Sequence, residues 1–254
     1  MEIIDSHCHI HDKEMYGDKQ EEAYKQSIDA GVAMICVGTD IKSSMDSIEF
    51  CLSHKHCYSL IGIHPHEAKD NNPSEIRDMV EKFRDEIVGI GEIGLDYYYE
   101  NSPRERQIEV LREQLAIARD FNLPVSFHVR NAFDDFWPIF DEFSGIRGVL
   151  HSFTDNYENY LEAKKRGLYI GINGISTFTR DKDQIDLYKK IPLEEILLET
   201  DAPFLTPSPF RGKMNISAYV KLVAEHQAKQ RETNLDDVIR ITTENVRKVF
   251  GDIS

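Results

Sequence analysis

Short apolar runs alternate with longer segments of helical periodicity from one end of the chain to the other. Continuous apolar runs are expected in strands covered on both faces, and their alternation with helices indicates βα units and a parallel sheet. The eight predicted strands are Ile3–Asp5, Met34–Gly38, Ser59–Ile63, Ile87–Glu92, Val125–His128, Gly148–His151, Leu168–Ile172 and Ile196–Glu199. Eight strands with intervening helices in 254 residues favour an α/β fold of the (β/α)₈ TIM barrel type over an open sheet. Because no linker or internal repeat is visible, we predict a single domain spanning residues 1–254.

The segments between the predicted strands carry the start and stop signals of helices. Asn72 followed by proline predicts one helix start, and Ser102–Glu105 (Ser-Pro-Arg-Glu) predicts a capping box with its proline at the first helical position. Gly31 and Gly167 fall where glycine is expected to end a helix. Two further helices are predicted near the end of the chain, around Ala218–Gln230 and over Asn234–Phe250.

Side chains that can bind metal ions follow most of the predicted strands. They are His7 and His9 after the first strand, Glu92 at the end of the fourth, His128 at the end of the fifth, His151 at the end of the sixth and Asp201 just beyond the eighth. Residues two apart in extended chain point to the same side, so the two histidines of the His-Cys-His segment can face one ion. A lone histidine is more often simply hydrogen-bonded, and a lone carboxylate can cap a helix. Six such positions on one barrel rim, where active sites are built, favour a metal centre instead.

Composition and charge limit the classes of partner. The net charge of −15 argues against a broad surface for nucleic acid, although it does not exclude phosphate chemistry in a cleft that holds divalent cations. No apolar run approaches the roughly 20 residues of a membrane span, and the N-terminus lacks the features of a signal peptide. The four cysteines form neither a CxxC pair nor a regular framework. We therefore expect a cytoplasmic protein with reduced thiols, no membrane contact and no obligate protein partner.

Several motifs carry a family resemblance. They are His7-x-His9, Gly62–His66 (Gly-Ile-His-Pro-His), Gly91–Tyr97 (Gly-Glu-Ile-Gly-Leu-Asp-Tyr), His128–Arg130, His151–Phe153, Glu199–Pro207 (Glu-Thr-Asp-Ala-Pro-Phe-Leu-Thr-Pro) and Phe210–Gly212. In this order and over the whole chain they resemble the TatD family of metal-dependent deoxyribonucleases. One departure is Asp155, which stands where the family usually has glycine. This difference affects the shape of a loop rather than the ligand set.

The resemblance implies a TIM-type barrel, divalent metals and Mg²⁺-dependent DNase activity that is often exonucleolytic. It also implies a ligand assignment, in which His7, His9, Glu92 and Asp201 hold one metal and Glu92 bridges to a second held by His128 and His151. Asp201 would in addition orient or deprotonate the attacking water. The chemistry of four imidazoles favours Zn²⁺, Mn²⁺ or Fe²⁺, whereas Mg²⁺ prefers oxygen ligands. The sequence leaves the identity of the two cations open.

Candidate substrate contacts surround the predicted ligands. His64 follows the third strand and either contacts a substrate phosphate or bonds to a loop carbonyl. Arg130 and Arg211 can each grip phosphate oxygens in a bidentate manner, or else form salt bridges on the acidic surface. The run Tyr97–Tyr99 can stack on a base, although loop packing is the more common role of such a run.

Two classes of reaction fit these residues. The first is hydrolysis of DNA phosphodiester bonds, from an end or on single strands, which needs little extended basic surface. The alternative is hydrolysis of an amide or ester, such as an aminoacyl ester on tRNA, by the same metal centre. A non-catalytic metal-binding scaffold is disfavoured because the ligand set is intact. The cationic candidates around the rim favour the phosphate substrate.

Overall fold

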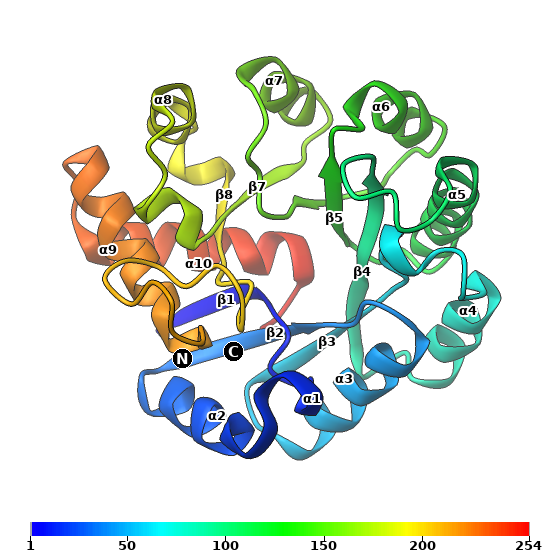
Figure 1. Cartoon of the computed structure of the whole chain (residues 1–254), viewed down its shortest axis with the longest axis horizontal. Coiled ribbons are helices and arrows are strands. Elements are labelled where there is room, and N and C mark those ends of the chain that lie inside the picture. Colours follow the sequence, from blue (N-terminus) through cyan, green and yellow to red (C-terminus); the bar gives the residue numbers. More distant parts are fainter. Residues whose placement is uncertain (1, 254) are drawn as a thin grey trace.

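The computed structural model describes residues 2–253, and its eight strands form one parallel sheet in sequential order. The strands are β1 (Ile3–Cys8), β2 (Val32–Val37), β3 (Cys57–Ile61), β4 (Ile87–Asp96), β5 (Val125–Arg130), β6 (Gly148–Leu150), β7 (Tyr169–Ile172) and β8 (Ile196–Leu198). The two edges meet where Cys8 pairs with Ala202 in a parallel bridge and the Asp201 amide donates to the His7 carbonyl at 2.9 Å. The predicted (β/α)₈ barrel is thereby confirmed (Figure 1).

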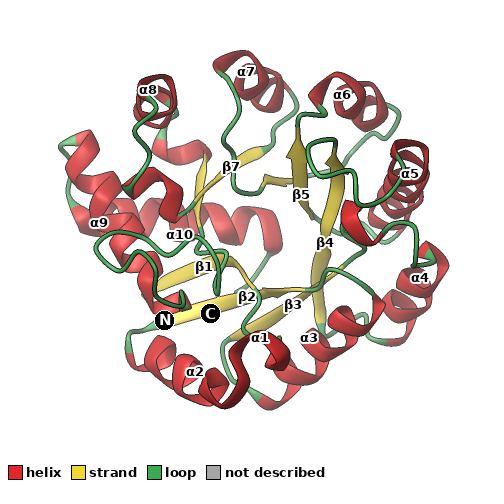
Figure 2. Cartoon of the chain, in the orientation of Figure 1, coloured by secondary structure: helices red, strands yellow, loops and turns green. Residues whose placement is uncertain are grey.

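Helices alternate with the strands and surround the sheet (Figure 2). They are α1 (Lys13–Tyr16), α2 (Gln20–Asp29), α3 (Ile41–Ser53), α4 (Pro73–Lys82), α5 (Arg104–Asp120), α6 (Phe133–Asp141), α7 (Tyr157–Lys165), α8 (Lys182–Lys190), α9 (Val220–Arg231) and α10 (Leu235–Phe250). Short 3-10 turns are η1 (Gly17–Lys19), η2 (Pro65–Glu67), η3 (Gly174–Thr177), η4 (Leu193–Glu195) and η5 (Ser217–Tyr219). Within residues 2–253, no helix has both the length and the apolar character needed to cross a membrane.

Most of the predicted helix signals act as expected. Asn72 caps α4 by accepting the amide of Ser74, and Gly31 and Gly167 adopt positive φ angles of 74° and 70° after α2 and α7. The predicted capping box is wrong, because α5 begins at Arg104 and has no side-chain cap. Ser102 instead donates its hydroxyl to the His66 carbonyl at 2.7 Å, which ties the start of α5 to the η2 turn.

Two apolar cores hold the barrel together. The larger lies between the sheet and the outer helices, and the smaller contains side chains that alternate with it along the strands, such as Ile4 and Ile35. The smaller core continues into Val246 and Val249 of α10, which crosses behind the strands in Figure 1. The Asn245 side chain donates to the carbonyls of Leu193 in η4 and of Ile196 at the start of β8. Helix α10 therefore closes the N-terminal end of the barrel, and the opposite end is left for the site.

Strand β4 is longer than predicted, and this extension shapes the site. The prediction ended it at Glu92, but it pairs with β5 as far as Asp96, which lies opposite Arg130. Gly94 allows this extension: its φ is 153°, and a Cβ atom there would lie 1.7 Å from the carbonyl oxygen of His128. Only glycine permits such a close approach of two backbones. Glu92 therefore projects from within the strand, and Asp96 occupies its end.

Candidate metal centre

The six predicted ligand residues come together at the C-terminal end of the barrel. His7, Glu92 and His128 lie on β1, β4 and β5, while His9, His151 and Asp201 follow β1, β6 and β8. Five of them line a cavity of about 500 Å³, and His7 lies fully buried beside it. Convergence of strand ends on one face is the property of the barrel on which the prediction depended.

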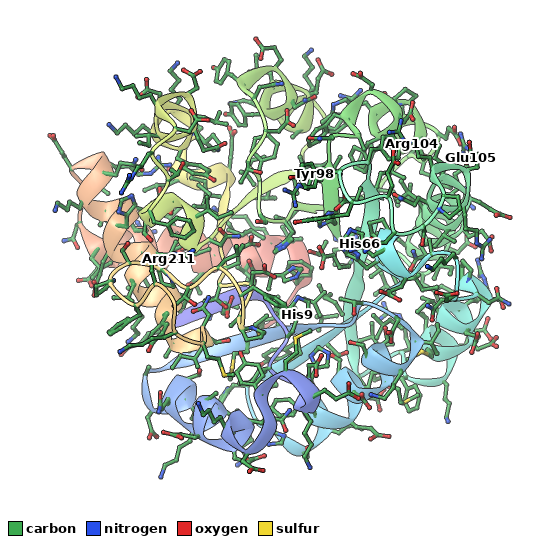
Figure 3. All side chains as sticks on the ribbon, in the orientation of Figure 1. His9, His66, Tyr98, Arg104, Glu105 and Arg211 are labelled. Carbon is green, nitrogen blue, oxygen red and sulfur yellow. The ribbon has the colours of Figure 1, made fainter. Side chains whose placement is uncertain are left out.

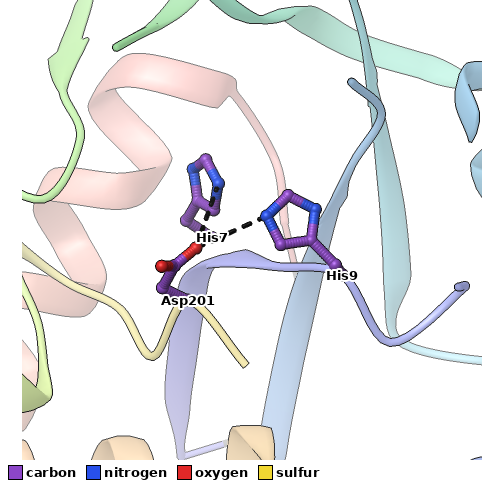
Figure 4. A group of neighbouring side chains, drawn as sticks. All are labelled: His7, His9 and Asp201. Carbon is purple, nitrogen blue, oxygen red and sulfur yellow. Dashed lines mark ion pairs between the residues drawn. The ribbon is translucent and has the colours of Figure 1, made fainter. Parts of the chain in front are cut away.

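Asp201 lies beside both His7 of β1 and His9, which follows β1 (Figure 4). Its Oδ1 lies 3.4 Å from Nε2 of His9 and 3.9 Å from Nε2 of His7. The other ring nitrogens have partners elsewhere, because Nδ1 of His9 donates to the Val37 carbonyl at 2.8 Å and Nδ1 of His7 contacts the Ser126 hydroxyl at 3.3 Å. Both Nε2 atoms are thus free to ligate. Asp201 has a φ of 58°, a left-handed conformation that aspartate tolerates better than most residues.

Glu92 lies between this pair and the histidines of the other strands. Its Oε2 is 3.4 Å from Nε2 of His7, and its Oε1 is 3.0 Å from Nδ1 of His128. Oε1 also lies 3.8 Å from Nε2 of His151, whose ring stacks on that of His7 with centroids 3.5 Å apart. One carboxylate therefore faces imidazoles from three strand ends, the position that a bridging ligand requires.

Two further carboxylates hold these imidazoles from behind. Asp96 accepts the Nε2 proton of His128 at 2.9 Å, and Oε1 of Glu199 lies 3.0 Å from Nδ1 of His151. The Glu199 contact is close but poorly directed, so it is an ion-pair contact rather than a hydrogen bond. A carboxylate behind a metal-binding imidazole fixes the ring orientation and its tautomer. Sequence reasoning missed both residues, although each lies an even number of positions from a predicted ligand in the same motif.

Asp96 also connects the metal centre to the loops around it. The side chain is fully buried, and its Oδ2 accepts from Nε2 of both His128 and His66 at 2.9 Å. Its Oδ1 accepts the backbone amides of Tyr98 and Tyr99 at 2.9 and 3.1 Å. These four hydrogen bonds satisfy both oxygens and tie the η2 turn, β5 and the turn after β4 to one point.

The pKa values reflect these close contacts. Burial, the largest influence, raises the pKa of Glu92, but the surrounding imidazoles, among them those of His151 and His128, outweigh it and hold that pKa well below its usual range. Burial lowers the pKa of His128, but hydrogen bonds to its carboxylate partners raise it to about 9. For His151, the charges of Glu199 and Glu92 outweigh burial and raise the pKa to about 10. At neutral pH these two protonated imidazoles therefore face ionised carboxylates.

His64 differs from the other histidines of the centre. Its Nδ1 accepts the backbone amide of His66 at 3.2 Å, so a neutral ring carries its proton on Nε2. That nitrogen lies 3.7 Å from Oε1 of Glu92. Burial, together with the charge of His128, lowers the pKa of His64 well below its usual value, which keeps the ring neutral. His64 thus offers a donor to the cavity rather than a lone pair.

The two predicted phosphate-binding arginines lie in different places. Arg130 lines the cavity, and its guanidinium lies 4.0 Å above the centroid of the Tyr98 ring. Arg211 is not among the cavity-lining residues of the described chain, and it packs 3.7 Å above Phe178 while donating to the Thr206 carbonyl. Figure 3 shows Arg211 well apart from His66 and Tyr98. The structure therefore brings only Arg130 of this pair to the cavity.

The arrangement of donors fits divalent cations. Three overlapping groups have ligand atoms within 4.8 Å of one another: His7 with His9 and Asp201, His7 with Glu92 and His151, and His64 with Glu92 and His128. Nε2 of His7 is fully buried and has no hydrogen-bond partner among the described residues. A buried polar atom without a partner is costly, and a bound cation would satisfy it. In the third group, the tautomer of His64 leaves Glu92 and His128 as the usable ligands.

Comparison with known proteins agrees with this geometry. The family described as TatD related DNase matches residues 4–251. The chain is 35% identical over 251 residues to the uncharacterized metal-dependent hydrolase YabD of Bacillus subtilis, with 98% of both proteins covered. It is 31% identical over 245 residues to the 3′–5′ ssDNA/RNA exonuclease TatD of Salmonella typhimurium, with 92% of this chain and 94% of that protein covered.

Solved structures show the same architecture. The TatD homologue YJJV of Escherichia coli superposes with a TM-score of 0.91 at 26% identity, covering 99% of this chain and 98% of that one. A TatD family hydrolase of Entamoeba histolytica gives a TM-score of 0.88 at 21% identity, covering 98% and 97% of the two chains. The second likeness concerns the fold alone.

Proposed function

This chain belongs to the family of TatD-related DNases, and from that premise we propose that it is a metal-dependent hydrolase of DNA phosphodiester bonds. We propose further that it acts from an end or on single strands. The observation that carries the proposal is the convergence of six ligand-capable side chains on one cavity. The name of the Salmonella typhimurium relative, a single-strand exonuclease, supports the choice of substrate.

Two cations would share the ligand set through Glu92. His7, His9 and Asp201 would hold one with Glu92, and His128 and His151 would hold the other with Glu92. The contacts of Glu92 with His7 and with His128, through different oxygens, support this bridge. Nitrogen donors predominate in the set, which favours Mn²⁺ or Zn²⁺ over Mg²⁺. The family resemblance favours Mg²⁺, so a metal screen decides between them.

The chain's own residues supply orientation and a proton acceptor. When bound, divalent cations withdraw electron density from a phosphoryl oxygen and favour deprotonation of an attacking water. Burial raises the pKa of Asp201, but the hydrogen bond with His9 and the nearby imidazoles bring it below its usual value. Asp201 therefore stays ionised and accepts a hydrogen bond, then the proton, from the water. Two groups on the cavity wall would donate hydrogen bonds to phosphate oxygens: the Nε2–H of His64 and the guanidinium of Arg130.

Hydrolysis of labelled strands tests the proposal directly. Single- and double-stranded DNA and RNA are incubated with protein purified without chelator, with Mg²⁺, Mn²⁺ or Zn²⁺ added, beside a panel of amides and aminoacyl esters. We expect stepwise shortening of single-stranded DNA. If every nucleic acid stays intact under all metals while an ester or amide is hydrolysed, the phosphodiesterase assignment is wrong.

Two variants test the assigned roles. Glu92→Ala should lower the metal content from two ions to one or none, because it removes the shared ligand; retention of two ions would show that another residue bridges. Asp201→Asn keeps a residue type that tolerates a positive φ, so the fold should persist while turnover is lost. A near-normal kcat for Asp201→Asn would refute its role as proton acceptor.

A further inference from the structure

Two tyrosines next to the cavity are exposed instead of packed. The sequence favoured loop packing for the run Tyr97–Tyr99, and the first tyrosine does pack, with its hydroxyl on Asp135. Tyr98 and Tyr99 are 56% and 55% exposed, and their rings meet edge to face with centroids 4.8 Å apart. The guanidinium of Arg130 lies 4.0 Å from one centroid and 4.9 Å from the other. Arg130, Tyr98 and Tyr99 form what we call the aromatic platform.

The aromatic platform is joined to the metal centre. Arg130 and His66 both line the cavity, and the His66 ring lies edge to face with Tyr99 at 5.6 Å. Asp96 accepts the backbone amides of both platform tyrosines and the Nε2 proton of the ligand His128. The backbone that carries these rings is thus held relative to the ligands. Figure 3 shows Tyr98 and His66 close to each other in this view.

A third exposed aromatic residue lies on the other side of the cavity. Phe204 lines the cavity, is 48% exposed, and packs edge to face against His9 with centroids 6.3 Å apart. It follows β8, whereas Tyr98 and Tyr99 follow β4 and Arg130 is the last residue of β5. In a closed sheet of eight sequential strands, β4 and β8 lie opposite each other. A chain running from the platform to Phe204 therefore passes over the ligands.

Basic side chains contribute little to holding a polyanion here. Among the cavity-lining residues within 2–253, Arg130 is the one lysine or arginine, and Glu67 adds a further negative charge. The whole chain has a net charge of −15. Proteins that bind single strands combine basic grooves with aromatic rings, and stacking on a ring is available to every base. With the basic groove missing, the aromatic rings are the principal source of affinity.

We propose that single-stranded nucleic acid lies across the mouth of the barrel, with one base stacked on the aromatic platform and a base beyond the scissile phosphate stacked on Phe204. The inference rests on the proposed function, because it takes the cavity between these rings as the site of the phosphate. It adds a source of affinity besides the cations: stacking on both sides, with little contribution from basic side chains. A duplex end, whose bases are already stacked on each other, should bind more weakly than a single strand.

Equilibrium binding measures the stacking separately from cleavage. The probes are two short single strands with hydrolysis-resistant phosphorothioate linkages, one with 2-aminopurine at its 3′ end and one with 2-aminopurine at its 5′ end. The fluorescence of 2-aminopurine falls when it stacks on a ring. We expect Tyr98→Ala, Tyr99→Ala and Phe204→Ala each to weaken binding by about 5- to 150-fold and to reduce the quenching of the probe whose labelled base reaches that ring. Tyr98→Phe, Tyr99→Phe and Phe204→Tyr keep the ring and should bind within about twofold of the wild type. Tyr157→Ala removes an exposed aromatic residue of α7 and is the matched control, with no expected change.

Salt and an abasic strand sharpen the test. With one cationic contact, the logarithm of the dissociation constant should rise with the logarithm of salt concentration with a slope of about 0.7. The wild type should bind a strand that lacks the base stacked on the platform as weakly as Tyr98→Ala binds the intact strand. Tyr98→Ala should bind that abasic strand no more weakly than the wild type does. A steep salt slope, or unchanged binding by the alanine variants, overturns the stacking proposal even if DNA is cleaved. Ring-dependent binding without hydrolysis upholds the stacking and refutes the proposed function instead.

Discussion

Replacing Asp96 by Asn tests whether one buried carboxylate sets the proton positions of the metal centre. In the native site both Asp96 oxygens act only as acceptors, two bonds each, from His66, His128 and two backbone amides. An Asn side chain has nearly the same shape but offers one oxygen and one NH₂ donor. The NH₂ group of the Asn side chain would therefore meet either the two histidine N–H groups or the two backbone N–H groups, and in each case donor would face donor. An imidazole can move its proton to the other ring nitrogen, whereas a backbone amide cannot, so the NH₂ should turn toward the histidines.

The magnitude follows from the position of the moved proton. A bound cation requires the neutral ring of His128. If Nε2 of that neutral ring accepts from the Asn amide, its single proton sits on Nδ1, 3.0 Å from Glu92, and that nitrogen can no longer ligate a cation. Metal binding requires the proton of His128 to return to Nε2, where it would face the NH₂ of the Asn. The hydrogen bond that the Asp96 carboxylate accepts from His128 in the wild type is then lost, and such a bond to a charged group is worth about 1.5–3 kcal/mol. At 1.36 kcal/mol per tenfold change, the affinity for one cation should fall by about 10- to 150-fold. The cation of the His7, His9 and Asp201 group should be affected by less than about threefold.

Metal titration by calorimetry, with metal analysis after dialysis, measures the two affinities separately. His66→Gln is the matched control, because it removes the other partner of Oδ2 and leaves the bond between Asp96 and His128 in place. Its metal affinities should stay within about twofold of the wild type. If Asp96→Asn binds both cations as tightly as the wild type does, the carboxylate does not fix the tautomer of His128. If His66→Gln loses as much affinity, the effect comes from the loop rather than from the ligand.

Three further predictions follow from burial, charge and backbone geometry. Burial, the dominant influence, raises the pKa of Asp5 from 3.8 to about 7, so the folded state holds its proton to higher pH and stability falls as pH rises between these values. Relative to the wild type, the free energy of unfolding of Asp5→Asn should therefore rise by up to about 4 kcal/mol between pH 4 and pH 8, as measured by urea unfolding of metal-free protein. The same dependence of unfolding free energy on pH in both proteins would contradict this. The pKa values of His128 and His151 are raised to about 9 and 10 against the effect of burial, so both rings must lose a proton to bind a metal at pH 7. Metal binding should therefore release protons and become tighter as pH rises toward 9. Calorimetry in two buffers of different ionisation enthalpy measures the proton release. Gly94→Ala should cost at least about 3 kcal/mol in unfolding free energy because its Cβ would overlap the His128 carbonyl, whereas Gly145→Ala, with open space around it, should cost about 1–2 kcal/mol.

The fold was accessible from the sequence because each strand and helix is encoded locally. Apolar runs such as Val32–Val37 are buried along their whole length, and the signals at Asn72 and Gly31 act within a few residues. The errors arose where a distant contact decides the outcome. Ser102 forgoes helix capping because its hydroxyl bonds to the His66 carbonyl, 36 residues away in sequence. The extension of β4 to Asp96 likewise depends on how closely Gly94 approaches a neighbouring strand.

The family resemblance that the motifs indicated is confirmed by the match to residues 4–251. The location of the candidate ligands was also predictable, because strand ends of a barrel meet on one face. The carboxylates behind them were not, since the pairings of Asp96 with His128 and of Glu199 with His151 join residues 32 and 48 positions apart. Arg130 and Arg211 show the same limit: both follow strands in motifs, yet only one side chain reaches the cavity. The direction of a long side chain depends on partners such as Phe178, which spacing does not reveal.

The net negative charge of the chain is compatible with a nucleic acid substrate because many of the acidic side chains lie outside the cavity. Many acidic side chains pair with arginines on the outer helices, as Asp141 and Glu162 do with Arg166, and so lie away from the cavity. Inside the cavity the ionised carboxylates of Glu92 and Asp201 face imidazoles, and their negative charge is what cations would neutralise. Attraction for a phosphate therefore depends mainly on cations held by the ligands, and Arg130 and His64 add to it. Chelator-treated protein should bind the phosphorothioate strand at least tenfold more weakly than loaded protein, and equal binding would place the phosphate contacts outside the metal centre.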